Sequence, residues 1–266
     1  MRLCVIGNSH LAALKLGWDA LSRAGDPAWA KVTPVFFGAP RDGMRQVRLD
    51  DGCIVPARKD IGEQFALMSG GQTRIRLGDY DGFVLVGLNV SIKRILRLYR
   101  THLWYGLADD PRKTLLHSGV ATDFLTERYG STLLVQTAAL LRGAVSAPIV
   151  ALAEPFWASW VRAERDAKPD YGWDKAISAG DAAALAGMFR STVTAALAPH
   201  ASFVPQPPQT VEDGILTAAP YNKDASRLIS GDGGGTDAAH MNGAFGAALW
   251  PLLRQALQSE TSVAAA

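Results

Sequence analysis

Cysteine and long apolar runs are both scarce in this sequence. Only two of its 266 residues are cysteines, Cys4 and Cys53, and Cys4 lies inside a short apolar segment. This usage excludes a disulfide framework and a cysteine metal cluster, and it is typical of a reducing compartment. A membrane-spanning helix needs about 20 apolar residues, but even the apolar stretch 133–150 is interrupted by Gln136 and Arg142. Since no cationic leader with a cleavage site precedes the first apolar segment, we expect a cytoplasmic protein without a membrane span.

An excess of one charge sign is lacking as well. The chain has 27 Lys and Arg against 25 Asp and Glu, a formal net charge of +2, and these residues are scattered. A nucleic-acid surface and a polybasic membrane patch both need clustered basic residues, so we expect neither partner. The hydrophobic content of 48% is enough to form a sizeable core. We interpret residues 1–266 as a single domain of the α/β class.

Short apolar runs that end in small or polar residues predict buried parallel strands. These runs are residues 3–6, 33–37, 82–86 and 148–152. Segments with apolar residues at helical spacing predict helices that rest on the sheet. These segments are residues 9–22, 131–142 and 242–257. The alternation of strands and helices favours a doubly wound sheet.

Residues of about 44–80 interrupt this alternation and predict a β-hairpin insertion. One hairpin is expected over residues 46–55, with its turn at residues 50–52 (Asp-Asp-Gly), and a second over residues 64–77, with its turn at residues 69–71 (Ser-Gly-Gly). Together they would form a small flap. The alanine-rich end of the chain, residues 258–266, is expected to fray.

Ser9 lies where the first predicted strand ends and a predicted helix begins. Open α/β folds form their ligand crevices at this carboxyl edge of the sheet. The first N–H groups and the partial positive charge of a helix also stabilise an oxyanion. A serine in this place is equally a common helix cap, so the local sequence leaves a catalytic and a capping role open.

Near the other end of the chain, Asp237 and His240 lie three residues apart. An aspartate at Nδ1 orients an imidazole and stabilises its protonated form, and the imidazole then activates a serine hydroxyl. One Asp and one His do not make a metal site, and the remaining histidines show no zinc-type spacing. The glycine-rich residues 231–235 lack the lysine of a phosphate cradle and predict a flexible loop. We therefore predict a Ser9–His240–Asp237 triad with no metal and no cofactor.

Four further residues are candidates for the site. Asn89 ends a Gly-Leu-Asn turn after the third predicted strand, where its amide can donate to an oxyanion, although such turns are ordinary. His10, Glu154 and Trp157 are candidate substrate contacts. Each has a structural alternative, since His10 can pack in the first helical turn, Glu154 can hold a loop and Trp157 can anchor one.

Three sequence blocks resemble the conserved blocks of the SGNH (GDSL-like) hydrolases. They are Gly7–Ser9 (Gly-Asn-Ser), Gly87–Asn89 (Gly-Leu-Asn) and Asp237–His240 (Asp-Ala-Ala-His), in that family's order. The resemblance implies a three-layer α/β/α flavodoxin-like fold, with Ser9 as nucleophile, His240 as general base and then acid, and Asp237 as its orienting partner. Asn8 stands where an aspartate is common in the family, which removes a charge but keeps hydrogen-bonding capacity.

The resemblance also implies an oxyanion hole. Its donors would be the backbone N–H of Ser9, a glycine N–H after the second strand and the side chain of Asn89. Gly38 is the glycine that fits by position, with Gly43 as the second choice and then Gly70 or Gly71.

The implied activity is hydrolysis of a carboxylic ester through an acyl-enzyme. The substrate would be a small-molecule ester or an acylated saccharide, with a short acyl group such as acetyl. The lipase-type Gly-x-Ser-x-Gly elbow is absent, because Leu11 stands at its last position. Two alternatives remain open, an O-acyltransferase that uses the same acyl-enzyme and a binding protein that has lost activity on the same scaffold.

Overall fold

A parallel sheet of five strands forms the centre of the protein, in the order β10-β9-β6-β1-β2. The computed structural model describes residues 1–39, 42–163, 172–227, 231–232 and 237–264. The strands of this sheet are β1 (Arg2–Gly7), β2 (Thr33–Gly38), β6 (Gly82–Val86), β9 (Ile149–Leu152) and β10 (Ser202–Val204). The prediction of an α/β protein with a parallel central sheet is therefore confirmed, and β10 is an additional edge strand. Because β1 continues to β2 on one side and the chain then returns to β6 on the other, a crevice is expected above β1.

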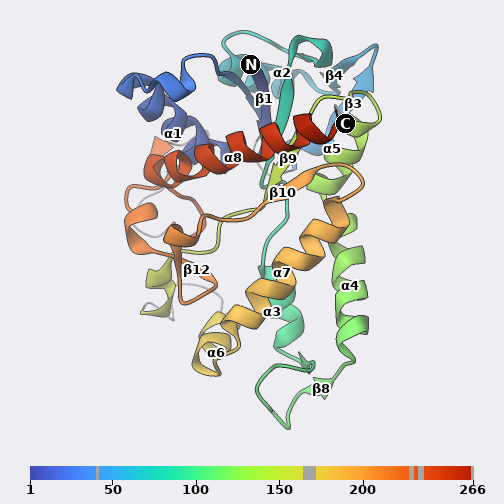
Figure 1. Ribbon diagram of the computed structural model, residues 1–266, viewed down its shortest axis with the longest axis vertical. Helices are drawn as coiled ribbons and strands as arrows, with labels where there is room; N and C mark the ends of the chain where they lie inside the picture. The colour runs from blue at the N-terminus through green and yellow to red at the C-terminus, as the bar shows by residue number, and fades with distance from the viewer. Residues whose placement is uncertain (40–41, 164–171, 228–230, 233–236, 265–266) are drawn as a thin grey trace.

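Helices cover both faces of the sheet (Figure 1). Alternate residues of a strand point to opposite faces, so Leu3 and Val5 pack with α1 (Leu11–Ala24) and α8 (Gly243–Ala264). On the other face, Cys4 and Ile6 belong to a larger core. The helices that contribute to this larger core include α2 (Lys59–Ser69), α3 (Lys93–Tyr99), α4 (Ser118–Gly130), α5 (Leu133–Arg142), α6 (Trp173–Ser178) and α7 (Ala182–Leu197).

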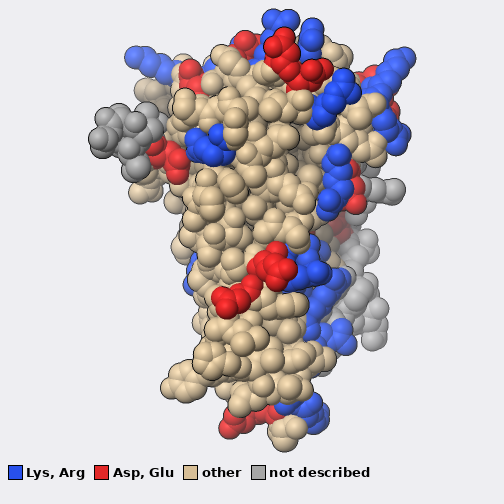
Figure 2. All heavy atoms as spheres, turned by 90° about the vertical axis from the view of Figure 1, so that its right-hand side faces the viewer, with Lys and Arg blue, Asp and Glu red and all other residues tan. Residues whose placement is uncertain are grey.

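The remaining strands are short and lie outside the central sheet. They are β3 (Val47–Asp50), β4 (Cys53–Pro56), β5 (Ile75–Arg76), β7 (His102–Leu103), β8 (Thr114–Leu115), β11 (Val211–Glu212), β12 (Leu216–Thr217), β13 (Ser226–Arg227) and β14 (Gly231–Asp232). Figure 1 shows α3 and α4 extending away from the sheet toward β8, and α7 extending from the sheet toward α6. No helix in the described ranges is long and apolar enough to cross a membrane. On the face shown in Figure 2, acidic and basic side chains lie beside one another.

Helices α1 and α8 pack unusually closely, which ties the two ends of the chain together. A side chain at Gly17 or Gly246 would collide with the backbone of the opposite helix. The buried indole of Trp250 donates a hydrogen bond from Nε1 to the carbonyl oxygen of Leu14 at 3.0 Å. Because Ser9 precedes α1 and His240 precedes α8, this packing holds both residues against the same edge of the sheet.

The insertion contains one of the two predicted hairpins. Strands β3 and β4 pair antiparallel, and the turn between them uses positive φ angles at Asp51 and Gly52. The second predicted hairpin is wrong, because its first half is helix α2, which ends at Gly70 in the left-handed conformation. Ile61 and Phe65 are spaced by one helical turn and both enter the core. Only β5 is extended, and it adds to β4 as a third strand.

Helix α8 runs past residue 257, where we expected it to end, and it continues through Pro251. Its carboxylate Glu260 accepts a hydrogen bond from the hydroxyl of Ser202 and lies 3.6 Å from Arg142. These contacts hold the helix against β10 and α5, so residues 258–264 are helical rather than frayed. Residues 265 and 266 lie outside the described residues.

Candidate active site

The structure brings Ser9, His240 and Asp237 together. The Oγ atom of Ser9 lies 2.7 Å from Nε2 of His240, across a sequence separation of 231 residues. Nδ1 of His240 lies 2.9 Å from Oδ2 and 3.1 Å from Oδ1 of Asp237. A carboxylate at Nδ1 leaves Nε2 free to accept the proton of the serine hydroxyl. The arrangement therefore has the geometry of a nucleophile, a base and an orienting acid.

The hydroxyl of Ser9 does not cap helix α1. His10 occupies the cap position and makes no side-chain capping bond, while the hydroxyl of Ser9 is engaged by His240. A serine that caps a helix accepts from an N–H of the first turn. The structure thus rejects the capping alternative and leaves this hydroxyl for the imidazole.

Close backbone contacts hold Ser9 at the end of β1. A Cβ atom at Gly7 would lie 2.6 Å from the carbonyl oxygen of Val86, so only glycine lets β1 close against β6 here. The side chain of Asn8 is buried, and its Oδ1 accepts from the N–H of His10 at 3.3 Å. The same Oδ1 faces Gly87, where a Cβ atom would lie only 2.6 Å away. The first two sequence blocks are therefore in direct contact.

Asp237 also shapes the loop that carries His240. Its Oδ1 accepts hydrogen bonds from the N–H groups of Ala239 at 3.1 Å and His240 at 3.3 Å. This side-chain-to-backbone turn is the typical local structure of aspartate, and it fixes the imidazole relative to the carboxylate. The glycine-rich segment before it was expected to be a loop, but Gly231 and Asp232 form β14, while residues 233–235 lie outside the described residues.

Asn222 holds the same loop in place through hydrogen bonds, a role that sequence reasoning missed. Its Nδ2 donates to the carbonyl oxygens of Asp237 at 2.8 Å and His240 at 2.6 Å, and its Oδ1 accepts from Trp160 at 2.7 Å. The side chain is buried, so these bonds are shielded from water. No local pattern around Asn222 indicates this role, because its partners are set by the tertiary fold.

The proposed oxyanion donors belong to adjacent strands at one edge of the sheet. Gly38 ends β2 directly opposite Gly7 of β1, and Asn89 follows β6 on the other side. The Nδ2 of Asn89 donates to Oδ1 of Asp42 at 3.0 Å, and Arg45 lies 3.7 Å from the same oxygen. This bond uses one of the two amide hydrogens and orients the group.

The alternative glycines differ in whether their N–H groups are already bonded. The N–H groups of Gly70 and Gly71 both donate to the carbonyl oxygen of Ala66 at the end of α2, so neither is available to an oxyanion. Gly43 follows Asp42, which bonds Asn89, and packs against Ala39. Gly38 and Gly43 therefore both stay candidate donors.

The turn that carries Asn89 is strained. Gly87, Leu88 and Asn89 all have positive φ angles, of 76°, 46° and 70°. For leucine this conformation is costly, and such strain persists only where the surroundings enforce it. The carbonyl oxygen of Leu88 accepts from the N–H of Leu134 in α5 at 3.0 Å, and the N–H of Val90 donates to Gly87 at 3.1 Å. These bonds hold the turn at the sheet edge.

Glu154 and Trp157 come together through Lys93, a residue that sequence reasoning missed. The Nζ of Lys93 lies 3.7 Å from the carboxylate of Glu154 and 5.3 Å from the ring centroid of Trp157. Burial raises the pKa of Glu154, while the ammonium group of Lys93 opposes that shift. Lys93 follows Asn89 by four residues at the start of α3, so its nearness to the sheet edge was the available signal.

His10 lies directly against His240. Its ring stacks on that of His240, with centroids 4.8 Å apart and planes inclined by 21°. Burial, with a further contribution from His240, lowers the pKa of His10 to about 3, so the ring is neutral near pH 7. Its Nδ1 is shielded from solvent and has no hydrogen-bond partner among the described residues.

A metal ion finds no donor set in the described part of the chain, where no group of three or more His, Cys, Asp or Glu is arranged to hold one.

Comparison with known proteins identifies no relative: no family model matches the chain, and no curated protein or solved structure matches it. The interpretation of the site therefore depends on its geometry and chemistry.

Proposed function

We propose that this protein is a serine hydrolase of the SGNH type that cleaves carboxylic esters of small molecules through an acyl-enzyme. The observation that carries the proposal is the 2.7 Å separation between Ser9 Oγ and His240 Nε2, with Asp237 at the opposite nitrogen. Ser9, His240 and Asp237 lie in two of the three sequence blocks that resemble this family, and Asn89 lies in the third. Since Ser9 lies within proton-transfer distance of a base, the geometry argues against the inactive alternative.

In the proposed reaction, Ser9 Oγ attacks the ester carbonyl carbon while His240 Nε2 takes the hydroxyl proton. Asp237 stabilises the resulting imidazolium. The tetrahedral intermediate collapses when the C–O bond to the alcohol breaks, and His240 gives its proton to the leaving oxygen. Water then attacks the acyl-enzyme with His240 again as base, which releases the acid and restores Ser9.

The negative charge that develops on the carbonyl oxygen needs donors that are already in place. We assign this role to the backbone N–H of Ser9, the backbone N–H of Gly38 and the amide of Asn89. The assignment is supported by the position of the three donors, which all lie at the carboxyl ends of β1, β2 and β6. Asp42 orients the amide of Asn89 through the bond described above.

Turnover of p-nitrophenyl acetate and butyrate tests the proposal. Ser9→Ala and His240→Ala should each lower kcat by at least about 10,000-fold, because the triad acts as a unit. Ser259→Ala and His200→Ala are matched controls, since Ser259 is exposed on α8 and His200 follows α7. Turnover that survives in the Ser9 variant would disprove the proposal. Product analysis with an added alcohol distinguishes hydrolysis from transfer to an acceptor.

A further inference from the structure

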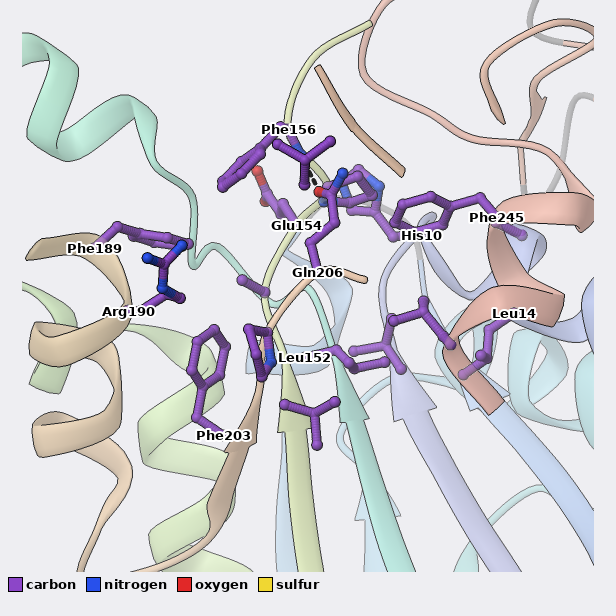
Figure 3. Close-up of a pocket in the computed structure, with 18 of the residues that line it drawn as sticks. His10, Leu14, Leu152, Glu154, Phe156, Phe189, Arg190, Phe203, Gln206 and Phe245 are labelled. Carbon is purple, nitrogen blue, oxygen red and sulfur yellow. Dashed lines mark hydrogen bonds between the residues drawn. The ribbon is translucent and has the colours of Figure 1, made fainter. Parts of the chain in front are cut away.

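A cavity of about 60 Å³ is lined in part by His10, the residue that follows Ser9 (Figure 3). It opens at the carboxyl ends of β6, β9 and β10, between helices α1, α7 and α8. His10 forms the wall nearest the triad, because its ring stacks on His240. The other walls are mainly apolar and include Leu14, Leu152, Phe156, Phe189, Phe203 and Phe245.

The polar groups in these walls are already engaged, apart from one atom of His10 and the side chain of Arg190, which is exposed to solvent. Glu154 pairs with Lys93. Gln206 donates from Nε2 to the hydroxyls of two threonines, and its Oε1 accepts from the N–H of Phe156 at 2.9 Å. Among the described residues that line the cavity, His10 Nδ1 is the buried side-chain atom without a hydrogen-bond partner.

A cavity with mainly apolar walls favours hydrocarbon, and a buried nitrogen that no described protein group bonds favours a polar partner. A ligand with a polar group at one end and a hydrocarbon tail satisfies both, provided that its polar end lies at His10. The triad is on that same side of the cavity. The wall chemistry therefore orients an ester substrate with its carboxyl end toward Ser9 and its tail toward Phe189 and Phe203.

The volume of the cavity sets the length of that tail. One water-sized group needs about 10–15 Å³ of cavity space, so roughly four to six such groups fit in this cavity. Each buried methylene improves binding by about fourfold when it leaves water for an apolar site. A chain that fills the cavity is therefore favoured over acetyl, and a much longer chain does not fit.

We infer that this cavity binds the acyl chain of the ester and selects chains of about five to seven carbons, including the carbonyl carbon at Ser9. The inference rests on the proposed function and adds the substrate class to it. His10 lines the cavity on the side of Ser9 and His240, so the carboxyl end of the chain is assigned to that side.

The test is the kcat/KM of p-nitrophenyl esters from acetate through butyrate, hexanoate and octanoate to dodecanoate. We expect a maximum at hexanoate, at least about tenfold above acetate, followed by a fall at dodecanoate. Ser9-dependent turnover that is equal for all chains, or greatest for acetate, would overturn the inference and leave the proposed function intact.

Two variants test whether the acyl chain of the substrate occupies this cavity. Val211 lines the cavity and is half-buried, so Val211→Phe should lower the ratio of hexanoate kcat/KM to acetate kcat/KM by about tenfold. Phe203→Ala widens the cavity and should shift the maximum toward octanoate. The matched control is Val47→Phe, the same change at a half-buried valine of β3. An unchanged chain-length profile in both cavity variants would contradict the assignment of this cavity.

Binding of sodium hexanoate to the Ser9→Ala protein separates the two proposals. Titration calorimetry should show saturable binding that Val211→Phe weakens by about tenfold and Val47→Phe does not change. If no ester is turned over but this binding is found, the hydrolase proposal fails and the cavity assignment stands. If hexanoate does not bind, the cavity assignment fails whether or not the protein hydrolyses esters.

Discussion

Two buried aspartates, Asp237 and Asp181, make similar contacts, but the proposed function assigns a catalytic role to Asp237 alone. Each accepts a backbone N–H and also bonds a titratable ring, His240 in the first case and Tyr99 in the second. The difference lies beyond the ring. His240 has a second nitrogen, and it faces Ser9 at the sheet edge. The single hydroxyl of Tyr99 is used by Asp181, so no second polar atom reaches outward.

The surroundings of Tyr99 also keep its hydroxyl protonated. Lys113 Nζ lies 3.2 Å from the centroid of its ring, and burial together with the bond to Asp181 raises the pKa of the phenol. The group therefore stays protonated near pH 7 and serves as a structural donor. A buried carboxylate beside a titratable ring indicates catalysis only where the ring presents a further polar atom to a reactive group.

The largest difference between the two sites should appear on replacement of the aspartates. Asp237→Asn keeps the shape of the side chain but favours the wrong tautomer of His240, so kcat for p-nitrophenyl butyrate should fall by about 10,000-fold. Asp181→Asn should leave kcat within about twofold, because Asp181 contacts no residue of the triad. Equal losses of kcat in the two variants would remove the distinction.

The oxyanion donor is the next largest expected effect. Asn89→Ala should lower kcat by about 100-fold to 1000-fold while KM changes little, because the amide is assigned a contact made in the transition state. Asn242→Ala offers a matched control at an asparagine that bonds Pro220 and Lys223. A loss below about tenfold would assign Asn89 to the structure of its turn alone.

A smaller effect on stability is expected at the structural aspartate. Tyr99→Phe removes the 2.7 Å bond to Asp181 and leaves a buried carboxylate oxygen unpaired. The free energy of unfolding, measured with urea, should fall by about 1–3 kcal/mol, with kcat unchanged. Tyr221→Phe is the matched control, because the hydroxyl of Tyr221 is not part of this cluster. A kcat that falls with Tyr99→Phe would show that the two sites are coupled.

The pH dependence of stability should distinguish His10 from the other histidines. Burial lowers the pKa of His10 from 6.5 to about 3. Between these values the unfolded chain binds a proton at this position and the folded protein does not, so stability falls as the pH decreases. In His10→Phe this loss should be smaller by about 1.2 kcal/mol between pH 6 and 5. Urea unfolding at both pH values measures it, with His200→Phe as the control, and equal slopes would contradict the assignment.

Much of the sheet was predictable because its strands are local apolar runs. Strands β1, β2, β6 and β9 agree with the predicted runs to within a residue or two. Strand β10 was missed because it is short and only partly buried, as expected of an edge strand. Helix α2 was missed because glycines at its C-terminal end suggested a hairpin turn, whereas its apolar residues Ile61 and Phe65 follow helical spacing.

The site was predictable where a short motif carries it. Asp237 and His240 are neighbours in sequence, and Ser9 follows a strand, so their meeting required only that the fold bring two chain ends together. Asn222 and Lys93 could not be assigned in this way. Their contacts with His240 and Glu154 connect segments that only the tertiary structure places side by side.

The central claim is that His240 activates Ser9, and covalent labelling with a fluorophosphonate tests it most directly. Attack by Ser9 Oγ on phosphorus expels fluoride and leaves one stable adduct, which peptide mass spectrometry assigns to a residue. The account predicts a single adduct on Ser9 that forms at least about 1000-fold more slowly in His240→Ala. An adduct on another residue, or an equal labelling rate without the imidazole, would contradict it.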